Sequence, residues 1–161
     1  MNHTLQLFLL LSALAAAQGA CPNGFHIVGN QCYRFSQEYS DTKTWEQART
    51  FCQFLDSDLA VLDLDCNDNN HLISYIISKG YTNIWVGASD TAMEGFWKWV
   101  DNRVVDMTST LWFYNEPDNP SSNDCARFVR ASGDFPRVYL YDHPCSQSLN
   151  YICQTGIHSK Q

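Results

Sequence analysis

The sequence has no excess of positive charge, and this argues against nucleic acid as a partner. Its 161 residues include 10 Lys and Arg against 17 Asp and Glu, for a formal net charge of −7 and a pI of about 5.0. Because an acidic domain repels a phosphate backbone, we expect no nucleic-acid partner. The length is sufficient for one domain with its own core.

The sequence also lacks the short motifs that carry common enzyme chemistry. There is no Gly-x-Ser-x-Gly, no His-Glu-x-x-His and no phosphate-binding loop, and the five histidines show no ligand spacing. The absence of a Cys-x-x-Cys pair argues against a zinc ribbon or a thioredoxin-like site. We therefore expect that the chain is not an enzyme.

A long hydrophobic run is missing as well. The main apolar stretch, residues 5–17, is too short to span a bilayer and ends in the small residues Ala15, Ala16 and Ala17. This pattern is typical of a secretory signal peptide at residues 1–20, with cleavage between residues 17 and 20. We therefore expect a secreted, extracellular protein without membrane insertion. Its folded domain would span residues 21–154, and residues 155–161 would form a short C-terminal tail.

Cysteine, by contrast, is abundant. In an oxidising compartment these residues indicate a disulfide framework, and their odd number leaves one thiol without a partner inside the chain. The seven cysteines are Cys21, Cys32, Cys52, Cys66, Cys125, Cys145 and Cys153.

Apolar periodicity predicts two helices. The first has Trp45, Ala48 and Cys52 on one face, and Thr44 with Gln47 resembles a capping box at its start. The second is predicted to begin within residues 67–70 and to stop at Gly80. The first helix would thus turn Cys52 inward, where a long-range disulfide can form.

Short alternating runs predict strands in the rest of the chain. Residues 24–35 alternate around a Gly-Asn turn and predict a hairpin. The long stretch 101–124 contains little regular structure, and such a loop inside a compact domain is usually functional. Further strands are predicted at residues 84–88, 96–100, 126–129, 137–141 and 151–153.

Residues 115–125 are the most unusual stretch of the chain. They combine three carboxylates, three carboxamides and two prolines with almost no apolar side chain. Carboxylate and amide oxygens are the ligands that calcium takes in proteins, and prolines reduce the entropy lost when an ion orders the loop. A solvated surface loop would have a similar composition, so composition alone leaves both interpretations open.

Several motifs in this order resemble the C-type lectin-like domain family, over essentially the whole of residues 21–154. Trp85-Val86-Gly87 is similar to the Trp-Ile-Gly core strand of the family, and Glu116-Pro117-Asp118 to its Glu-Pro-Asn sugar-site tripeptide. Asp142-His143-Pro144-Cys145 is similar to the end of its Trp-Asn-Asp-x-x-Cys strand. Trp97, Trp99 and Trp112 fit its buried tryptophans.

The resemblance implies an α+β fold in which two helices flank two small antiparallel sheets with a long binding loop region above. The cysteine order is similar to that of the long form of the family. It implies the disulfides Cys21–Cys32, Cys52–Cys153 and Cys125–Cys145, which leaves Cys66 unpaired. Cys66 lies between the predicted helices in a polar stretch. Its thiol would either link two chains into a homodimer or stay free.

The resemblance also implies two calcium sites. The sugar-binding site would use Glu116, Asp118, Asn123 and Asp142, all of which are also expected to hold the metal ion. Here Asn123 replaces the usual Glu, and Tyr141 replaces an Asn ligand, so we expect weak calcium binding because affinity falls with ligand number and charge. In the family the peptide before the central proline is cis, which we expect for Glu116–Pro117.

The auxiliary site implied by the resemblance would use four side chains and a main-chain oxygen of Asn123. All four are suitable oxygen donors, although a carboxylate-rich loop that only interacts with water is an alternative. These side chains are Asp90, Glu94, Asn119 and Asp124.

By this resemblance we expect a secreted, calcium-dependent lectin that binds glycans, with a role in recognising microbial surface sugars in innate immunity. Glu-Pro-Asp combines the mannose-type and galactose-type tripeptides, so it does not specify the sugar. The alternative is a domain that keeps the fold but binds a protein partner through Phe113, Tyr114 and Tyr141, with Trp112 favoured as a core residue.

Overall fold

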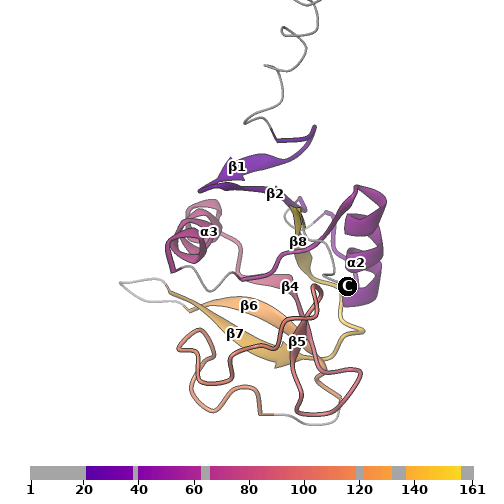
Figure 1. Ribbon diagram of the computed structural model, residues 1–161, viewed down its shortest axis with the longest axis vertical. Coiled ribbons are helices and arrows are strands. Elements are labelled where there is room, and N and C mark those ends of the chain that lie inside the picture. Colours follow the sequence, from indigo (N-terminus) through magenta and orange to yellow (C-terminus); the bar gives the residue numbers. More distant parts are fainter. Residues whose placement is uncertain (1–20, 38–39, 63–65, 119–121, 132–136, 157–161) are drawn as a thin grey trace, which may run out of the picture.

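The structure is a computed structural model that describes residues 21–37, 40–62, 66–118, 122–131 and 137–156 (Figure 1). The predicted signal peptide, Asn119 and the end of the C-terminal tail lie outside these residues. No helix in the described part has both the length and the hydrophobicity that crossing a membrane requires.

A mixed sheet organises the fold. Its strands follow the order β1-β2-β8-β4-β6-β7, with β3 beside β8 and β5 beside β4. The strands are β1 (His26–Val28), β2 (Gln31–Phe35), β3 (Ser57–Leu59), β4 (Asn83–Ser89), β5 (Lys98–Trp99), β6 (Cys125–Ala131), β7 (Arg137–His143) and β8 (Asn150–Thr155).

Two antiparallel groups of strands make up this sheet, and the parallel pair β4 and β8 joins them. The predicted α+β fold is therefore confirmed, with the difference that the β4–β8 pair joins the two small sheets into one mixed sheet. The strand predicted at residues 96–100 is limited to β5, because the chain turns at once through Asn102, whose φ is 71°. β8 extends to Thr155, one residue past the predicted domain end.

Both predicted helices are present. Helix α2 (Trp45–Phe54) begins with the predicted capping box, in which Thr44 and Gln47 exchange hydrogen bonds of 3.3 Å. Helix α3 (Cys66–Lys79) ends before Gly80, whose φ is +82°. Because α3 starts one residue earlier than predicted, Cys66 is its first residue and does not lie between the helices. Its side chain is outside the described part of the structure.

Aromatic side chains make up much of the core. Trp85 is fully buried, and the indole rings of Trp97 and Trp112 meet edge to face at 5.2 Å. Trp112 is 6% exposed, so it is a core residue, as favoured from the sequence. The indole of Trp45 on α2 donates to the carbonyl of Val86 at 2.8 Å, which fixes the helix to β4.

The three disulfides join the cysteine pairs that the resemblance implies. Cys52–Cys153 links α2 to β8 across 101 residues, a closure worth about 4–5 kcal/mol in the chain-entropy model. Cys125–Cys145 ties the start of β6 to the segment after β7. The third bridge, Cys21–Cys32, closes the N-terminal hairpin.

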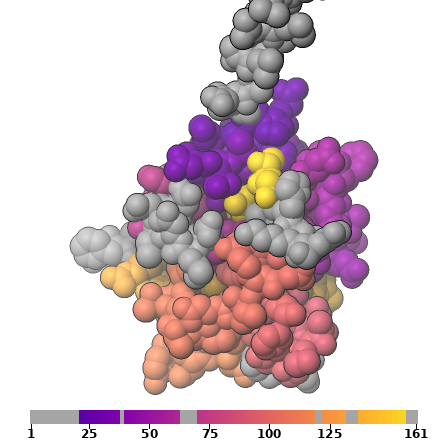
Figure 2. Space-filling model, viewed as in Figure 1, coloured from indigo at the N-terminus to yellow at the C-terminus, as the bar shows by residue number. Residues whose placement is uncertain are grey.

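The long loops between β4 and β6 gather at the end of the molecule opposite the β1–β2 hairpin (Figure 1). Their coral and orange residues form a continuous surface at this end in Figure 2. The loop region is attached to β7 by two backbone hydrogen bonds, from Leu140 N to Leu111 O at 2.7 Å and from Phe113 N to Leu140 O at 3.1 Å. The loop region is therefore held directly against the edge strand β7.

Candidate metal centre

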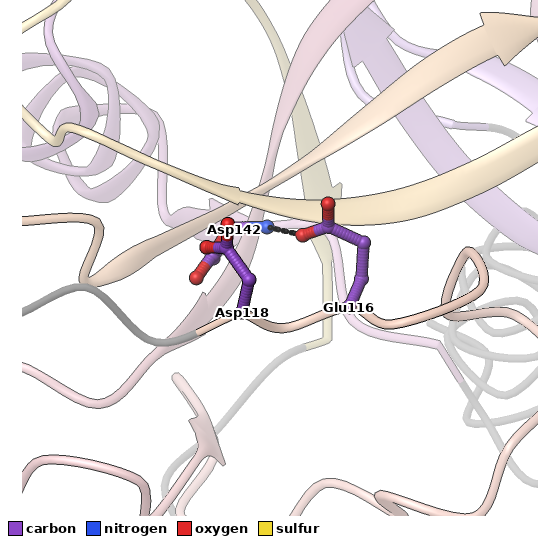
Figure 3. Close-up of side chains that lie close together, drawn as sticks. All are labelled: Glu116, Asp118 and Asp142. Carbon is purple, nitrogen blue, oxygen red and sulfur yellow. Dashed lines mark hydrogen bonds between the residues drawn. The ribbon is translucent and has the colours of Figure 1, made fainter.

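Three carboxylates from two distant parts of the chain converge beside β7. Glu116 and Asp118 come from the loop before β6, and Asp142 lies on β7 (Figure 3). One carboxylate oxygen of each residue lies within 4.8 Å of those of the other two. We call these residues the carboxylate triad. Three of the four side chains predicted for the sugar site are therefore brought together.

Backbone contacts place Glu116 at the edge of β7. The Glu116–Pro117 peptide is cis, as predicted. The Glu116 N–H donates to the carbonyl of Phe113 at 2.9 Å, which closes a tight turn. The Glu116 Oε2 atom accepts from the Asp142 backbone N–H at 3.4 Å (Figure 3). The Glu116 side chain thus covers an N–H group of the sheet edge and stands beside Asp142.

The spacing of the carboxylate triad suits a calcium ion. Calcium takes oxygen ligands at about 2.3–2.6 Å, so two ligands on opposite sides of one ion lie about 5 Å apart. The oxygen atoms of the triad stay within this limit. Carboxylates this close repel one another, and a divalent cation would remove that repulsion.

Tyr141 is the main departure from the expected ligand set. Burial raises the pKa of its phenol, and the charge of Glu116 raises it further. The phenol therefore stays protonated at neutral pH and is a poor calcium ligand. Its ring stacks on Phe113, with centroids 5.1 Å apart and planes at 18°. Asn123, the other substituted position, is half-buried just before β6.

A positive side chain lies near the triad. Arg127 faces Tyr141 across the β6–β7 pair, and its Nη1 donates to Asn83 Oδ1 at 2.7 Å. Burial lowers the pKa of Arg127, and the charges of Glu116 and Asp142 act in the opposite direction. This cation offsets part of the negative potential at the triad, which adds to the expectation of weak calcium binding.

Residues predicted for the auxiliary site form a second acidic group. Asp90 is only 3% exposed; its Oδ2 accepts from Gly95 N at 2.8 Å, and its N–H donates to the carbonyl of Asp124 at 3.2 Å. The Asp90 Oδ1 atom is buried and accepts no hydrogen bond from the described residues. A buried carboxylate oxygen without a donor is a suitable ligand for a cation.

The charges of this second group influence one another. Burial raises the pKa of Asp90, and the charge of Asp124 raises it further. Partial desolvation raises the pKa of Glu94, as do the charges of Asp90 and Asp124. Three of the four predicted side chains are thus close enough to interact, although their oxygens do not converge as tightly as those of the triad within the described structure.

Sequence reasoning missed the packing of aromatic rings next to the triad. Phe113 contacts Tyr141 and also Tyr139, whose ring lies 5.3 Å away at 70°. Strand alternation places Tyr139 and Tyr141 on one face of β7, and this part of the signal was available in the sequence. The contact with Phe113 depends on how the loop folds back, which periodicity does not indicate.

Comparison with known proteins gives a consistent result. Residues 41–155 match the family model "Lectin C-type domain". The chain is 31% identical over 137 residues to perlucin of Haliotis laevigata, covering 83% of this chain and 82% of perlucin. It is 28% identical over 158 residues to the C-type lectin lectoxin-Enh3 of Pseudoferania polylepis, covering 94% of each chain.

Solved structures show the same fold. The carbohydrate-recognition domain of the mouse scavenger receptor C-type lectin matches with a TM-score of 0.68 and 26% identity, over 84% of this chain and 95% of that one. The C-type lectin CEL-I from Cucumaria echinata matches with a TM-score of 0.68 and 25% identity, over 87% of this chain and 100% of that one. These relatives are lectins, in agreement with the expectation that the chain is not an enzyme. The chain belongs to the C-type lectin domain family.

Proposed function

We propose that the chain is a calcium-dependent lectin whose carboxylate triad holds the ion that binds a glycan. The observation that carries this proposal is the convergence of Glu116, Asp118 and Asp142 within 4.8 Å. When bound, the ion would supply open coordination positions for two neighbouring hydroxyl groups of a sugar. Asp90, Glu94 and Asp124 would hold a second ion, with Asn119 and Asn123 as further ligands.

The exposure of the triad supports a role in binding an external ligand. Asp118 is exposed and Glu116 is half-buried, so solvent reaches the oxygens that would face a sugar. Asp142 is buried at 5% exposure and would act as the fixed ligand. Carboxylates on the rim can accept hydrogen bonds from sugar hydroxyls while they hold the ion.

Glycan binding measured with calcium and with EDTA tests the proposal. We expect the oxidised chain from residue 21 onward to bind immobilised glycans only when calcium is present. Asp142→Asn removes one of three charged ligands and should weaken calcium binding at least about tenfold. Asp106→Asn is the matched control, because Asp106 is an exposed carboxylate of the same loop region that accepts from Thr108 instead.

If glycans bind equally well in EDTA, or if both variants behave alike, the triad is not the site. If no glycan binds with or without calcium, binding to a protein partner is the second candidate, favoured by the exposure of Phe113 (40%) and Tyr114 (83%). In that case, calcium would be structural or absent.

The location and biological setting are further parts of the proposal. Residues 1–20 would be a signal peptide that directs residues 21–154 to the outside of the cell. The glycans would belong to microbial surfaces, with a role in innate immunity, and binding to whole bacteria with and without calcium tests this. A homodimer linked through Cys66 would appear as a double-mass band on a non-reducing gel.

A further inference from the structure

A pocket of about 280 Å³ opens between the first half of α2 and the segment that joins β4 to β5. Its apolar lining includes Trp45 on α2, Trp99 on β5, and Met93 and Phe96 from the joining segment. The volume is close to the lower end of the range for small-molecule sites, about 300–1,000 Å³. None of the described residues that line it belongs to the carboxylate triad. We call it the α2 pocket.

The outer wall of the α2 pocket consists of apolar side chains that remain in contact with solvent. Met93 is 63% exposed and Phe96 is 42% exposed. Backbone hydrogen bonds of 2.9 Å fix both residues, from Met93 N to Asp90 O and from Phe96 N to Met93 O. The wall is therefore formed before any ligand binds. A ligand in the pocket would remove exposed apolar surface from water, which favours binding.

The charge of the α2 pocket is opposite in sign to that of the whole chain, whose net charge is −7. Arg49 and Lys98 line the pocket, and none of its described lining residues is acidic. Arg49 is already paired, because its Nε donates to Asp58 Oδ1 at 3.2 Å. Lys98 forms no salt bridge with the other described residues, and its Nζ lies 5.2 Å from the centroid of the Phe96 ring. Lys98 is therefore the cation that an anionic ligand can reach.

From these observations we infer that the α2 pocket binds a small amphipathic anion, a short acyl chain that ends in a carboxylate. The chain would lie against Trp45, Met93 and Trp99, and the carboxylate would face Lys98 at the rim. The unbranched, flexible side chain of Met93 adapts well to a flexible apolar ligand. Lysine acts as a compact point charge, so it pairs with a carboxylate without a fixed two-point geometry.

The two lining cations explain why the ligand should be an anion. A neutral ligand of the same length would make the apolar contacts but would leave Lys98 unpaired. A cationic ligand would be repelled by Lys98 and Arg49. The inference does not depend on the proposed function, because neither glycan nor calcium takes part in this binding.

Methyl NMR of the oxidised chain from residue 21 onward tests the inference. The sequence has three methionines, and only Met93 and Met107 remain in this chain. In EDTA, octanoate should shift the Met93 methyl signal until it saturates. The Met107 signal should stay in place, because Met107 does not line the pocket. Octan-1-ol should bind roughly three- to fivefold more weakly, the range of one exposed ion pair.

Two lysine variants test the role of charge. Lys98→Gln should make octanoate and octan-1-ol bind equally well. Lys79→Gln is the matched control and should keep the preference for octanoate, because Lys79 is also an exposed lysine above an aromatic ring, 5.4 Å from the centroid of Tyr75. Phe96→Ser removes part of the apolar wall and should weaken both ligands by a similar factor.

Three results would overturn the inference. The first is the absence of a saturable Met93 shift with octanoate in the parent chain. The second is equal binding of octanoate and octan-1-ol to the parent chain, which would show an apolar pocket without preference for an anion. The third is an unchanged preference for octanoate in Lys98→Gln. Glycan binding in calcium is a separate measurement, so a failure of either proposal leaves the other standing.

Discussion

Replacing Tyr141 with asparagine should change the stability of the ion-free domain and its calcium affinity in opposite directions. The substitution removes the stacking contact between Tyr141 and Phe113, whose centroids are 5.1 Å apart. Such a pair contributes about 0.5–1.5 kcal/mol beyond its buried area. We expect the ion-free domain to lose about 1 kcal/mol, or about 3–5 °C in Tm for a domain of this size.

The same change adds a carboxamide oxygen beside the triad, at the position where the family resemblance implies an Asn ligand. One more ligand should tighten calcium binding about tenfold, for example from a dissociation constant of about 1 mM to about 0.1 mM. At about 10 mM calcium, the stabilisation by the ion would rise from about 1.4 to about 2.7 kcal/mol. Calcium would therefore restore the stability that the lost ring contact removes.

Thermal unfolding with and without calcium, together with calorimetric titration, measures both effects. Tyr139→Asn is the matched control: it removes the contact of 5.3 Å with Phe113 on the same face of β7 but adds no ligand beside Asp142. It should lower Tm without tightening calcium binding. Unchanged calcium affinity in Tyr141→Asn would refute the reasoning, because position 141 would then lie outside the coordination sphere.

Three further predictions concern the supports of the site. The raised pKa values of Asp90 and Glu94 mean that these two carboxyl groups contribute more to the stability of the ion-free domain as pH falls toward the ordinary carboxyl value, whereas calcium affinity decreases over the same range, since protons compete with the ion. The contribution of Asp90 should be absent from unfolding curves of Asp90→Asn, and calcium titrations at several pH values should show the loss of affinity. The double change Cys125→Ala, Cys145→Ala should weaken calcium binding at temperatures where the far-UV spectrum is still native, because this bridge ties the loop to the strand of the triad. Gly87→Ala should destabilise the fold by at least about 2 kcal/mol in denaturant unfolding, since its methyl group would lie 2.7 Å from a backbone carbonyl oxygen.

Local signals in the sequence predicted the elements of the fold well. The capping box at Thr44 and Gln47 and the glycine stop at Gly80 depend on neighbours within a few residues, and both are present. The disulfide pairing depends on contacts such as that between Cys52 and Cys153, across 101 residues. The spacing of the cysteines along the sequence does not determine which of them pair, so the pairing was predicted from the family resemblance.

It was harder to predict in which of the two ion sites the ligand oxygens would lie closer together. The ligand types at Asp90, Glu94 and Asp124 are suitable, which from the sequence made the auxiliary site look the more complete. In the described structure it is the triad whose oxygens converge within 4.8 Å. Ligand type is visible in a sequence, but the distance between ligands depends on how loops from separate segments pack, and no local pattern encodes this.

The aromatic rings next to the triad show the same limit most clearly. Alternation along β7 puts Tyr139 and Tyr141 on one face, but only the fold shows that Phe113 is fixed there by its N–H bond to Leu140 O. That attachment also positions the turn that delivers Glu116 to Asp142. Because one stretch of backbone at the sheet edge orders both rings and carboxylates, ion binding and ring stacking cannot vary independently when this edge is disturbed. A change at the edge should therefore alter both, whereas a change confined to one exposed ring should alter stacking alone.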